Sequence, residues 1–222
     1  MMNNLFSVFD PTSYFGIPFN WMIMLLVFLY FPVKYYLISS GFFLMFKSVF
    51  LGVSKVFGEV AVPFSMGLNF LCVMTFLYLM MLNLLSLFPF IFTGSAHPMI
   101  TMGFGVVLWI SFFMMGWSKS FKESAAHLVP MGAPIGMAPL MVLIESVSHI
   151  IRPFTLSIRL AANMMAGHLI VGLLSSISTM SFFGLINSYL LQSILLVLEF
   201  GVSVIQAFVF SILLLLYALE YY

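Results

Sequence analysis

The feature that most restricts the fold of this chain is a series of apolar runs of about twenty residues or more, the length that one membrane crossing needs. Such runs occupy 15–33, 64–92 and 99–117, and two longer ones follow at 135–175 and 187–220. Hydrophobic residues make up 64% of the chain and charged residues only 6%, and the mean hydropathy is +1.21. The sequence therefore predicts an all-α membrane protein with about five membrane-embedded helices.

Segment 40–60 differs from these runs because its polar residues gather on one face of a helix. At about 100° per residue, Lys47 and Lys55 fall on one arc and Val53 falls opposite, although Leu51 interrupts the pattern. An amphipathic helix of this kind lies in the membrane surface. We therefore predict one interfacial helix beside the five embedded ones.

The last two runs are too long for an upright crossing. At 1.5 Å per residue, a helix of about forty residues extends roughly 60 Å, twice the thickness of the hydrocarbon core. It must tilt steeply or break, with Pro139 and Pro153 as candidate break points, and two shorter helices are the alternative. We expect one integral membrane domain over 1–222, comprising the first span and the interfacial helix (1–62), two spans and a polar loop (63–133), and a tilted helical hairpin (134–222).

One narrow stripe of the first long helix carries almost all its polar residues. On a helical wheel, Glu145, Arg152 and Asn163 fall within about 40° of Arg159, whereas His168 falls on the opposite face. A stripe of charged groups must face protein or water rather than lipid. The helix therefore has two polar environments.

Folding the two long segments into an antiparallel hairpin gives these residues partners. A turn centred near residue 183 places His168 opposite Glu199, and Arg159 close to Gln206. A buried His–Glu pair can hold or pass a proton, because burial and neighbours move both pKa values. The alternative is a static ion pair that fixes the helix register.

Arg159 has a different chemistry. A guanidinium stays protonated, so it cannot relay protons, but it can hold a partner carboxylate in its ionised form. At about 4 Å and an effective dielectric constant near 20, the attraction is about 4 kcal/mol, or roughly 3 pKa units. An arginine can thus force an approaching carboxylic acid to release its proton.

Three stretches carry a resemblance to a known family: "LIESVSHIIRP", "SIRLAANMMAGHLI" and "LEFGVSVIQAFVFSILLLLY". They resemble subunit a of rotary ATP synthases in its animal mitochondrial form. The resemblance implies that Arg159 is the stator arginine, which faces the c-ring and separates two aqueous half-channels. It implies that Asn163 and Gln206 are polar neighbours of that arginine. It also associates Glu145, His168 and Glu199 with the half-channels.

The same resemblance implies a role and a set of partners. The chain would be a non-catalytic, proton-translocating stator subunit without a cofactor or metal, working against a c-ring that carries an acid in mid-membrane. Its other partners would be peripheral-stalk and further membrane-sector subunits and the lipid bilayer. The expected location is the mitochondrial inner membrane.

Charge placement predicts an orientation. If the spans alternate, five lysines lie on one side, which the positive-inside rule makes the matrix side: Lys34, Lys47, Lys55, Lys119 and Lys122. The N-terminus would then face the intermembrane space and the C-terminus the matrix. No cation precedes Lys34, so we expect neither a signal peptide nor a transit peptide. The net charge of +1, without basic clusters, argues against nucleic acid as a partner.

Two other classes fit less well. A secondary transporter would show internal repeats, and the Arg159 stretch has no second copy in the chain. In a redox subunit two histidines would face one haem, but His149 and His168 are 19 residues apart on one helix. Cys72 is the single cysteine, which excludes an internal disulfide framework.

The remaining polar residues have structural interpretations. We expect Asn69 and Asn83, which share a helix face, to hydrogen-bond neighbouring helices. His97 is predicted to be a solvated turn residue. Arg152 would pair with Glu145 or face lipid headgroups. Ser86 and Met131 depart from the family pattern and are expected to lie outside the proton path.

Overall fold

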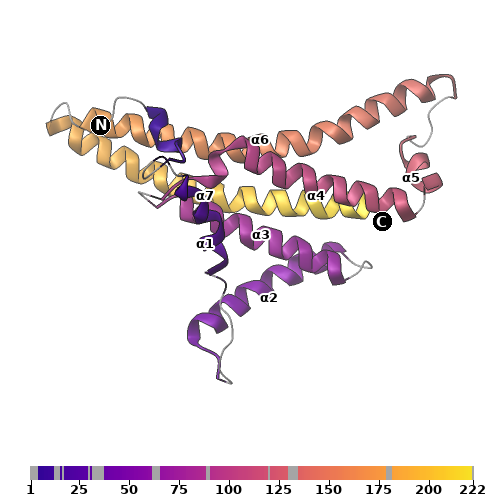
Figure 1. The fold of residues 1–222 in the computed structure, drawn as a ribbon, viewed down its shortest axis with the longest axis horizontal. Coiled ribbons are helices and arrows are strands. Elements are labelled where there is room, and N and C mark those ends of the chain that lie inside the picture. Colours follow the sequence, from indigo (N-terminus) through magenta and orange to yellow (C-terminus); the bar gives the residue numbers. More distant parts are fainter. Residues whose placement is uncertain are drawn as a thin grey trace.

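The computed structural model describes residues 5–12, 16, 18–29, 31, 38–61, 66–88, 91–119, 121–129, 135–178 and 182–221. These residues form α-helices and short 3-10 helices, and no strand occurs among them (Figure 1). The α-helices are α1 (Ile23–Leu29), α2 (Gly41–Ala61), α3 (Met66–Ser86), α4 (Pro98–Lys119), α5 (Phe121–His127), α6 (Ala138–Ser178) and α7 (Phe182–Tyr221). The 3-10 helices are η1 (Leu5–Phe9), η2 (Phe19–Met22), η3 (Gly94–Ala96) and η4 (Ile135–Met137).

The all-α membrane fold is confirmed. Helices α2, α3, α4, α6 and α7 are each long and apolar enough to cross a membrane. The interfacial position of α2 stays a prediction, although Lys47 and Lys55 are exposed as an interfacial helix requires. Its apolar residues are also mostly exposed, which is consistent with burial in lipid rather than in protein.

Two segments differ from the sequence-based expectation. The first span was predicted at 15–33, whereas the apolar helix that the structure describes there runs Phe19–Leu29, and several flanking positions lie outside the described residues. The polar segment after α4 was expected to be a loop, yet it contains the short helix α5.

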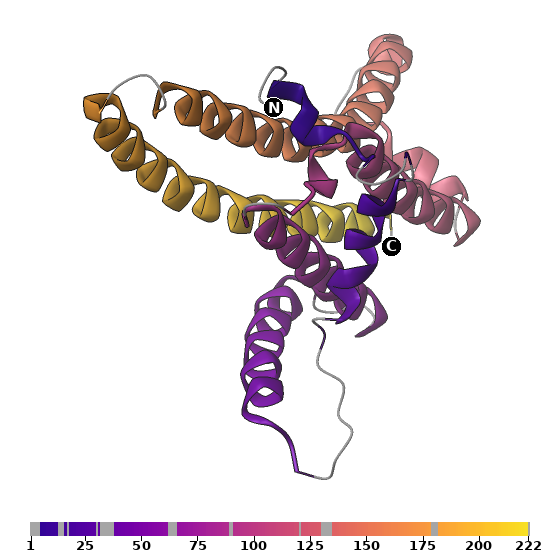
Figure 2. The same cartoon turned by 60° about the vertical axis from the view of Figure 1, so that its left-hand side comes forward.

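Helix α6 is continuous over its 41 residues, so the alternative of two shorter helices is wrong. Pro139 lies in its first turn, where no intrahelical N–H is needed. Pro153 lies inside the helix without ending it, and the Ser157 hydroxyl donates a hydrogen bond to its carbonyl at 2.8 Å. Figures 1 and 2 show α6 and α7 as two long helices that meet at one end, with α3 and α4 packed beside them.

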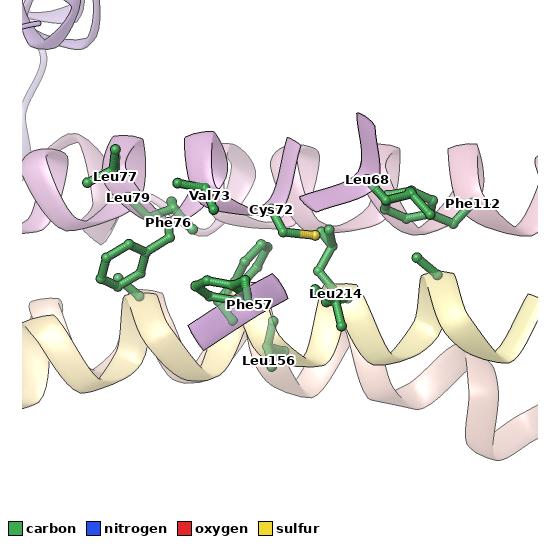
Figure 3. Close-up of a cluster of buried hydrophobic side chains, with 14 of the residues drawn as sticks. Phe57, Leu68, Cys72, Val73, Phe76, Leu77, Leu79, Phe112, Leu156 and Leu214 are labelled. Carbon is green, nitrogen blue, oxygen red and sulfur yellow. The ribbon is translucent and has the colours of Figure 1, made fainter. Parts of the chain in front are cut away.

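The main core lies between α3 and α7 (Figure 3). Cys72 and Val73 of α3 and Ala207 of α7 are fully buried there. Phe57 anchors α2 to this core, with its ring 6.2 Å from that of Phe76. Since lipid is as apolar as these side chains, close packing rather than water exclusion holds the helices together.

Interhelical and N-terminal hydrogen bonds complete the frame. The side-chain amide of Asn69 donates to the carbonyl of Ser54 on α2 at 3.3 Å, which confirms the structural interpretation of this residue. His97 is half-buried rather than solvated, because its Nε2 lies 3.0 Å from the carbonyl oxygen of Phe9 and its ring 5.3 Å from that of Trp21. The N-terminal segment is thereby fixed beside α6.

Candidate functional site

Helix α6 carries the predicted site residues Glu145, Arg159, Asn163 and His168, and helix α7 carries the other two. A stripe of α6 that includes Leu160 is buried against neighbouring helices. The predicted polar stripe lies beside it and contains exposed side chains, including Arg159. This face of α6 is therefore open to another molecule.

Arg159 lies in a groove of about 650 Å³ between α6 and the end of α7. We call it the arginine groove; its lining is Arg152, Thr155, Leu156, Arg159, Leu213, Leu216, Tyr217 and Leu219. Neither a hydrogen bond nor an ion pair joins Arg159 to any residue that the structure describes. An uncompensated cation at membrane depth costs several kcal/mol. The guanidinium must therefore be solvated by water or paired with an anion on another molecule.

The next turns of α6 face a smaller cavity of about 170 Å³. We call it the Glu199 cavity; its polar lining residues are Asn83, Asn163, Glu199, Ser203 and Gln206. Three of the six predicted site residues, Asn163, Glu199 and Gln206, thus meet in one cavity. Gln206 lines this cavity, whereas Arg159 lines the arginine groove, and the expected closeness of Arg159 and Gln206 stays a prediction.

Asn83 contributes to the Glu199 cavity from helix α3. Its side-chain amide donates to the carbonyl of Ser203 on α7 at 3.4 Å, which confirms the predicted interhelical hydrogen bond. Its Oδ1 is buried and has no hydrogen-bond partner. A cavity of this volume with several polar groups has room for more than one water molecule. Water held there would satisfy Oδ1 and connect it to the other polar groups of the lining.

A glycine of α6 creates the space for Glu199. A Cβ atom built on Gly167 would collide with the Glu199 carboxylate, so only glycine admits this acid against the face of α6. Gly167 is also the residue before His168, the predicted partner of Glu199. The structure therefore places Glu199 one residue away from the predicted level on α6.

His168 does not line the Glu199 cavity. Between His168 and Glu199, both of which the structure describes, there is no direct ion pair. The His168 ring is hydrogen-bonded to the backbone of Ser86, and its Nε2 is buried without a partner. Ser86 lies beside His168, and its expected position outside the proton path stays a prediction; Met131 lies outside the described residues.

At the other end of α6, Glu145 pairs within its own helix. Its Oε1 lies 3.6 Å from Nε2 of His149, four residues later. Arg152 is turned towards α7, with its guanidinium carbon 6.0 Å from the ring centroid of Tyr217. Helical spacing alone could have found the His149 contact, whereas the Tyr217 contact depends on where α6 and α7 cross.

The polar side chains that line the Glu199 cavity suit protons and water more than a metal ion. No three His, Cys, Asp or Glu side chains gather into a metal site within the part of the chain that the structure describes. The Glu199 cavity offers one carboxylate, three amides and one hydroxyl, all of which hydrogen-bond water.

Known proteins resemble this chain over nearly its whole length. The family model described as ATP synthase A chain matches residues 2–218. The chain is 44% identical to ATP synthase subunit a of Artemia franciscana over 226 aligned residues, which cover 99% of this chain and 100% of the relative. It is 40% identical to ATP synthase subunit a of Drosophila melanogaster and 41% identical to that of Anopheles gambiae, with 99% of each chain covered.

Proposed function

Since this chain belongs to the family of ATP synthase A chains, we propose that it is the subunit of a mitochondrial ATP synthase membrane sector that leads protons to and from a rotating c-ring. It is a multi-pass membrane protein and itself performs no ATP chemistry. Arg159 separates two aqueous half-channels, of which one contains Glu199 and the other begins at Glu145.

The observation that carries the proposal is the position of Arg159. It is an exposed cation in a membrane-spanning helix, and no described residue of its own chain compensates it. A carboxylate on a neighbouring subunit is the partner that such a guanidinium recognises best. The c-ring carboxylate provides that charge each time a c-subunit passes.

The arrangement along α6 supports separate routes on the two sides of Arg159. Glu145 lies fourteen residues before Arg159, about 21 Å along the helix axis, and Gly167 lies eight residues after it, about 12 Å. The Glu199 cavity and the arginine groove share no lining residue, and Leu156 of the groove lies one turn before Leu160 of the cavity on α6. A proton can therefore pass between the two sides only on the ring.

The proton cycle follows from electrostatics. On the Glu199 side, water brings a proton to the ring carboxylate and neutralises it, so that this c-subunit can move through lipid without the cost of a bare charge. On the other side, Arg159 attracts the carboxylate and favours its ionised form. The proton leaves towards Glu145, and each proton that crosses 100 mV supplies about 2.3 kcal/mol.

The orientation completes the proposal. The lysine-rich side is the matrix side, so that α6 begins and α7 ends there, and the N-terminus faces the intermembrane space. Protons then enter through the Glu199 cavity and leave past Glu145 into the matrix. Peripheral-stalk and other membrane-sector subunits cover the remaining exposed faces.

The test is Arg159→Ala in the assembled complex in vesicles, with proton-driven ATP synthesis and passive proton leak both measured. We expect synthesis to fall by about 100-fold or more, because an attraction of about 4 kcal/mol is lost. Lys47→Gln on α2 removes an exposed cation far from the site and serves as the control. Near-normal coupled synthesis in an assembled Arg159→Ala complex would contradict the proposal, and solute transport by the isolated chain would favour a transporter.

A further inference from the structure

Two buried hydroxyls at η3 have no hydrogen-bond partner among the residues that the structure describes. Thr93 immediately precedes η3 and Ser95 lies in its middle, and each residue is only 1% exposed. Most other serines and threonines of the helices donate to a carbonyl of their own preceding turn, as Thr101 does to that of Pro98 at 3.2 Å. The three residues of η3 provide no such turn. A buried hydroxyl without a partner costs about 1–3 kcal/mol, so we expect both hydroxyls to bind a group from outside the chain.

The end of α3 brings two further polar atoms to the same region. Helix α3 ends at Ser86, beside α6, and η3 packs against α3, α4 and α6. The His168 ring is hydrogen-bonded to the backbone of Ser86, while its Nε2 is buried and has no partner within the described part of the chain. The same holds for Oδ1 of Asn83, one turn before Ser86. Buried polar atoms that gather in this way are typical of places where a protein binds water.

Met164 connects η3 with the Glu199 cavity. Its buried side chain belongs to a cluster with Phe9 and with Ala96 of η3, and it also lines the cavity. Its sulfur lies 3.5 Å from the hydroxyl oxygen of Ser86. The side chain of methionine is unbranched and flexible, so its rotation can open a path without any movement of the helix. The hydroxyls of η3 are therefore separated from the cavity by a side chain that can move.

We propose that Thr93 and Ser95 line the entrance through which water and protons reach the Glu199 cavity, and that the Met164 side chain is the movable closure of this entrance. The inference rests on the proposed function, in which α3 begins on the lysine-rich side and ends, with η3, on the entry side. Water that enters binds the two hydroxyls and passes Met164 to the cavity. Because a hydroxyl donates and accepts hydrogen bonds at once, it orders the water molecules along which protons move.

Contacts with the N-terminal segment hold η3 in place. His97 directly follows η3, and its Nε2 lies 3.0 Å from the carbonyl oxygen of Phe9. The Trp21 ring lies 5.3 Å from the His97 ring and 5.6 Å from the Phe92 ring, so aromatic contacts fix both ends of this short segment. The hydroxyls of η3 thereby keep a constant position on α6, which a site that orders water requires.

The first experiment asks whether water reaches η3, with Thr93→Cys and Ser95→Cys in assembled complexes in vesicles. Silver ions are added on the entry side, and proton flow through the membrane sector is measured. A silver ion binds a thiolate only where water can bring it, so we expect both variants to lose most of their proton flow. Thr101→Cys is the matched control, because Thr101 is also buried but its hydroxyl is bonded within α4. The parent chain, whose Cys72 is fully buried, gives the background.

The second experiment removes the hydroxyls without changing the shape of the side chains. Thr93→Val and Ser95→Ala each take away one group that binds water, so we expect proton flow to fall about fivefold in each variant. Thr101→Val should stay close to wild type, because the hydroxyl of Thr101 is already bonded within its own helix.

The third experiment restricts the movement of the closure. Met164→Ile keeps an apolar side chain but is branched at Cβ and therefore stiff, so we expect a lower proton flow and a slower action of silver ions on Ser95→Cys. Met165→Ile is the control, since Met165 packs against the same cluster but does not line the Glu199 cavity.

Three results would overturn the inference. The first is proton flow in Thr93→Cys and Ser95→Cys that silver ions leave unchanged or lower only from the release side. The second is an equal loss in Thr101→Cys, and the third is an equal effect of the isoleucine changes at the two methionines, which would remove the closure. If Arg159→Ala abolishes synthesis while silver ions have no effect at η3, this inference fails and the proposed function stands. Near-normal synthesis by Arg159→Ala contradicts the proposed function whatever silver ions do.

Discussion

The two halves of α6 border two different polar spaces. Before Asn163, Arg152 and Arg159 point into a groove of about 650 Å³ and are exposed. From Asn163 onwards, α6 borders a cavity of about 170 Å³, where Glu199 of α7 lies against Gly167. Cations that face outward require an anion from another molecule, whereas an acid that faces inward requires water or an internal partner. In the proposed function, the same helix serves a moving partner at one level and a fixed water-filled route at the other.

The largest effect on ATP synthesis is expected from filling the space next to Glu199. Gly167→Ala places a methyl group where the Glu199 carboxylate lies, so the acid must leave its position in the cavity. We expect proton-driven ATP synthesis to fall by about 100-fold, the order of loss for a displaced reacting group. Gly201→Ala on α7 is the matched control, because nothing lies within 4 Å of the Cβ it would add.

Assembly should be checked for both glycine variants by purification of the intact complex. Alanine favours a helix over glycine, so neither change should weaken the helix itself. Equal rates for Gly167→Ala and Gly201→Ala would show that the position of Glu199 does not limit proton flow.

A smaller effect is expected from the polar residue that α3 adds to the same cavity. Asn83→Leu removes the donor to Ser203 and the buried Oδ1, and makes this part of the lining apolar. We expect the rate of synthesis to fall about fivefold, which corresponds to the loss of one hydrogen-bond partner of about 1 kcal/mol. The reduction should grow when protons become scarce on the entry side, because water that delivers them is lost.

Asn69→Leu provides the control for this change. Asn69 lies on the same helix and also donates an interhelical hydrogen bond, but to Ser54 on α2 and away from the Glu199 cavity. Both variants lose one bond of similar strength, so packing effects should be similar. If Asn69→Leu lowers synthesis as much as Asn83→Leu does, the cavity lining has no special role.

The contrast between the two halves explains what the sequence could reveal. Helical spacing along one element predicted the outward stripe of Arg159, and the length of the apolar runs predicted the long hairpin. The level of Glu199 could be predicted to within one residue, because an antiparallel hairpin has a single free parameter, its turn. These inferences depend only on helical periodicity, on the length of the apolar runs and on the position of one turn.

What the sequence did not reveal depends on how helices cross. In the sequence, nothing distinguishes Gly167 from other small residues, although Glu199 packs against it. Nothing in the sequence indicates that the Tyr217 ring lies near Arg152. Ser86 meets His168 and Met164 because the last turn of α3 ends beside α6. Crossing angles follow from packing among all the helices, and no local pattern encodes them.

The smallest expected effect concerns a second close approach, which supports α6 without belonging to either polar environment. A Cβ on Gly105 of α4 would collide with the hydroxyl of Ser157, which is fully buried. Gly105→Ala should therefore destabilise the α4–α6 contact by about 1–3 kcal/mol, as overpacking does, while coupled synthesis by intact complexes changes little. The measurement is the temperature at which the purified complex dissociates. Gly103→Ala, with open space around its Cβ, should leave that temperature unchanged, and Ser157→Ala combined with Gly105→Ala should restore it by removing the hydroxyl. If Gly105→Ala instead abolishes synthesis at full stability, the contact between α4 and α6 belongs to the proton path, and α4 helps to form that path together with α6 and α7.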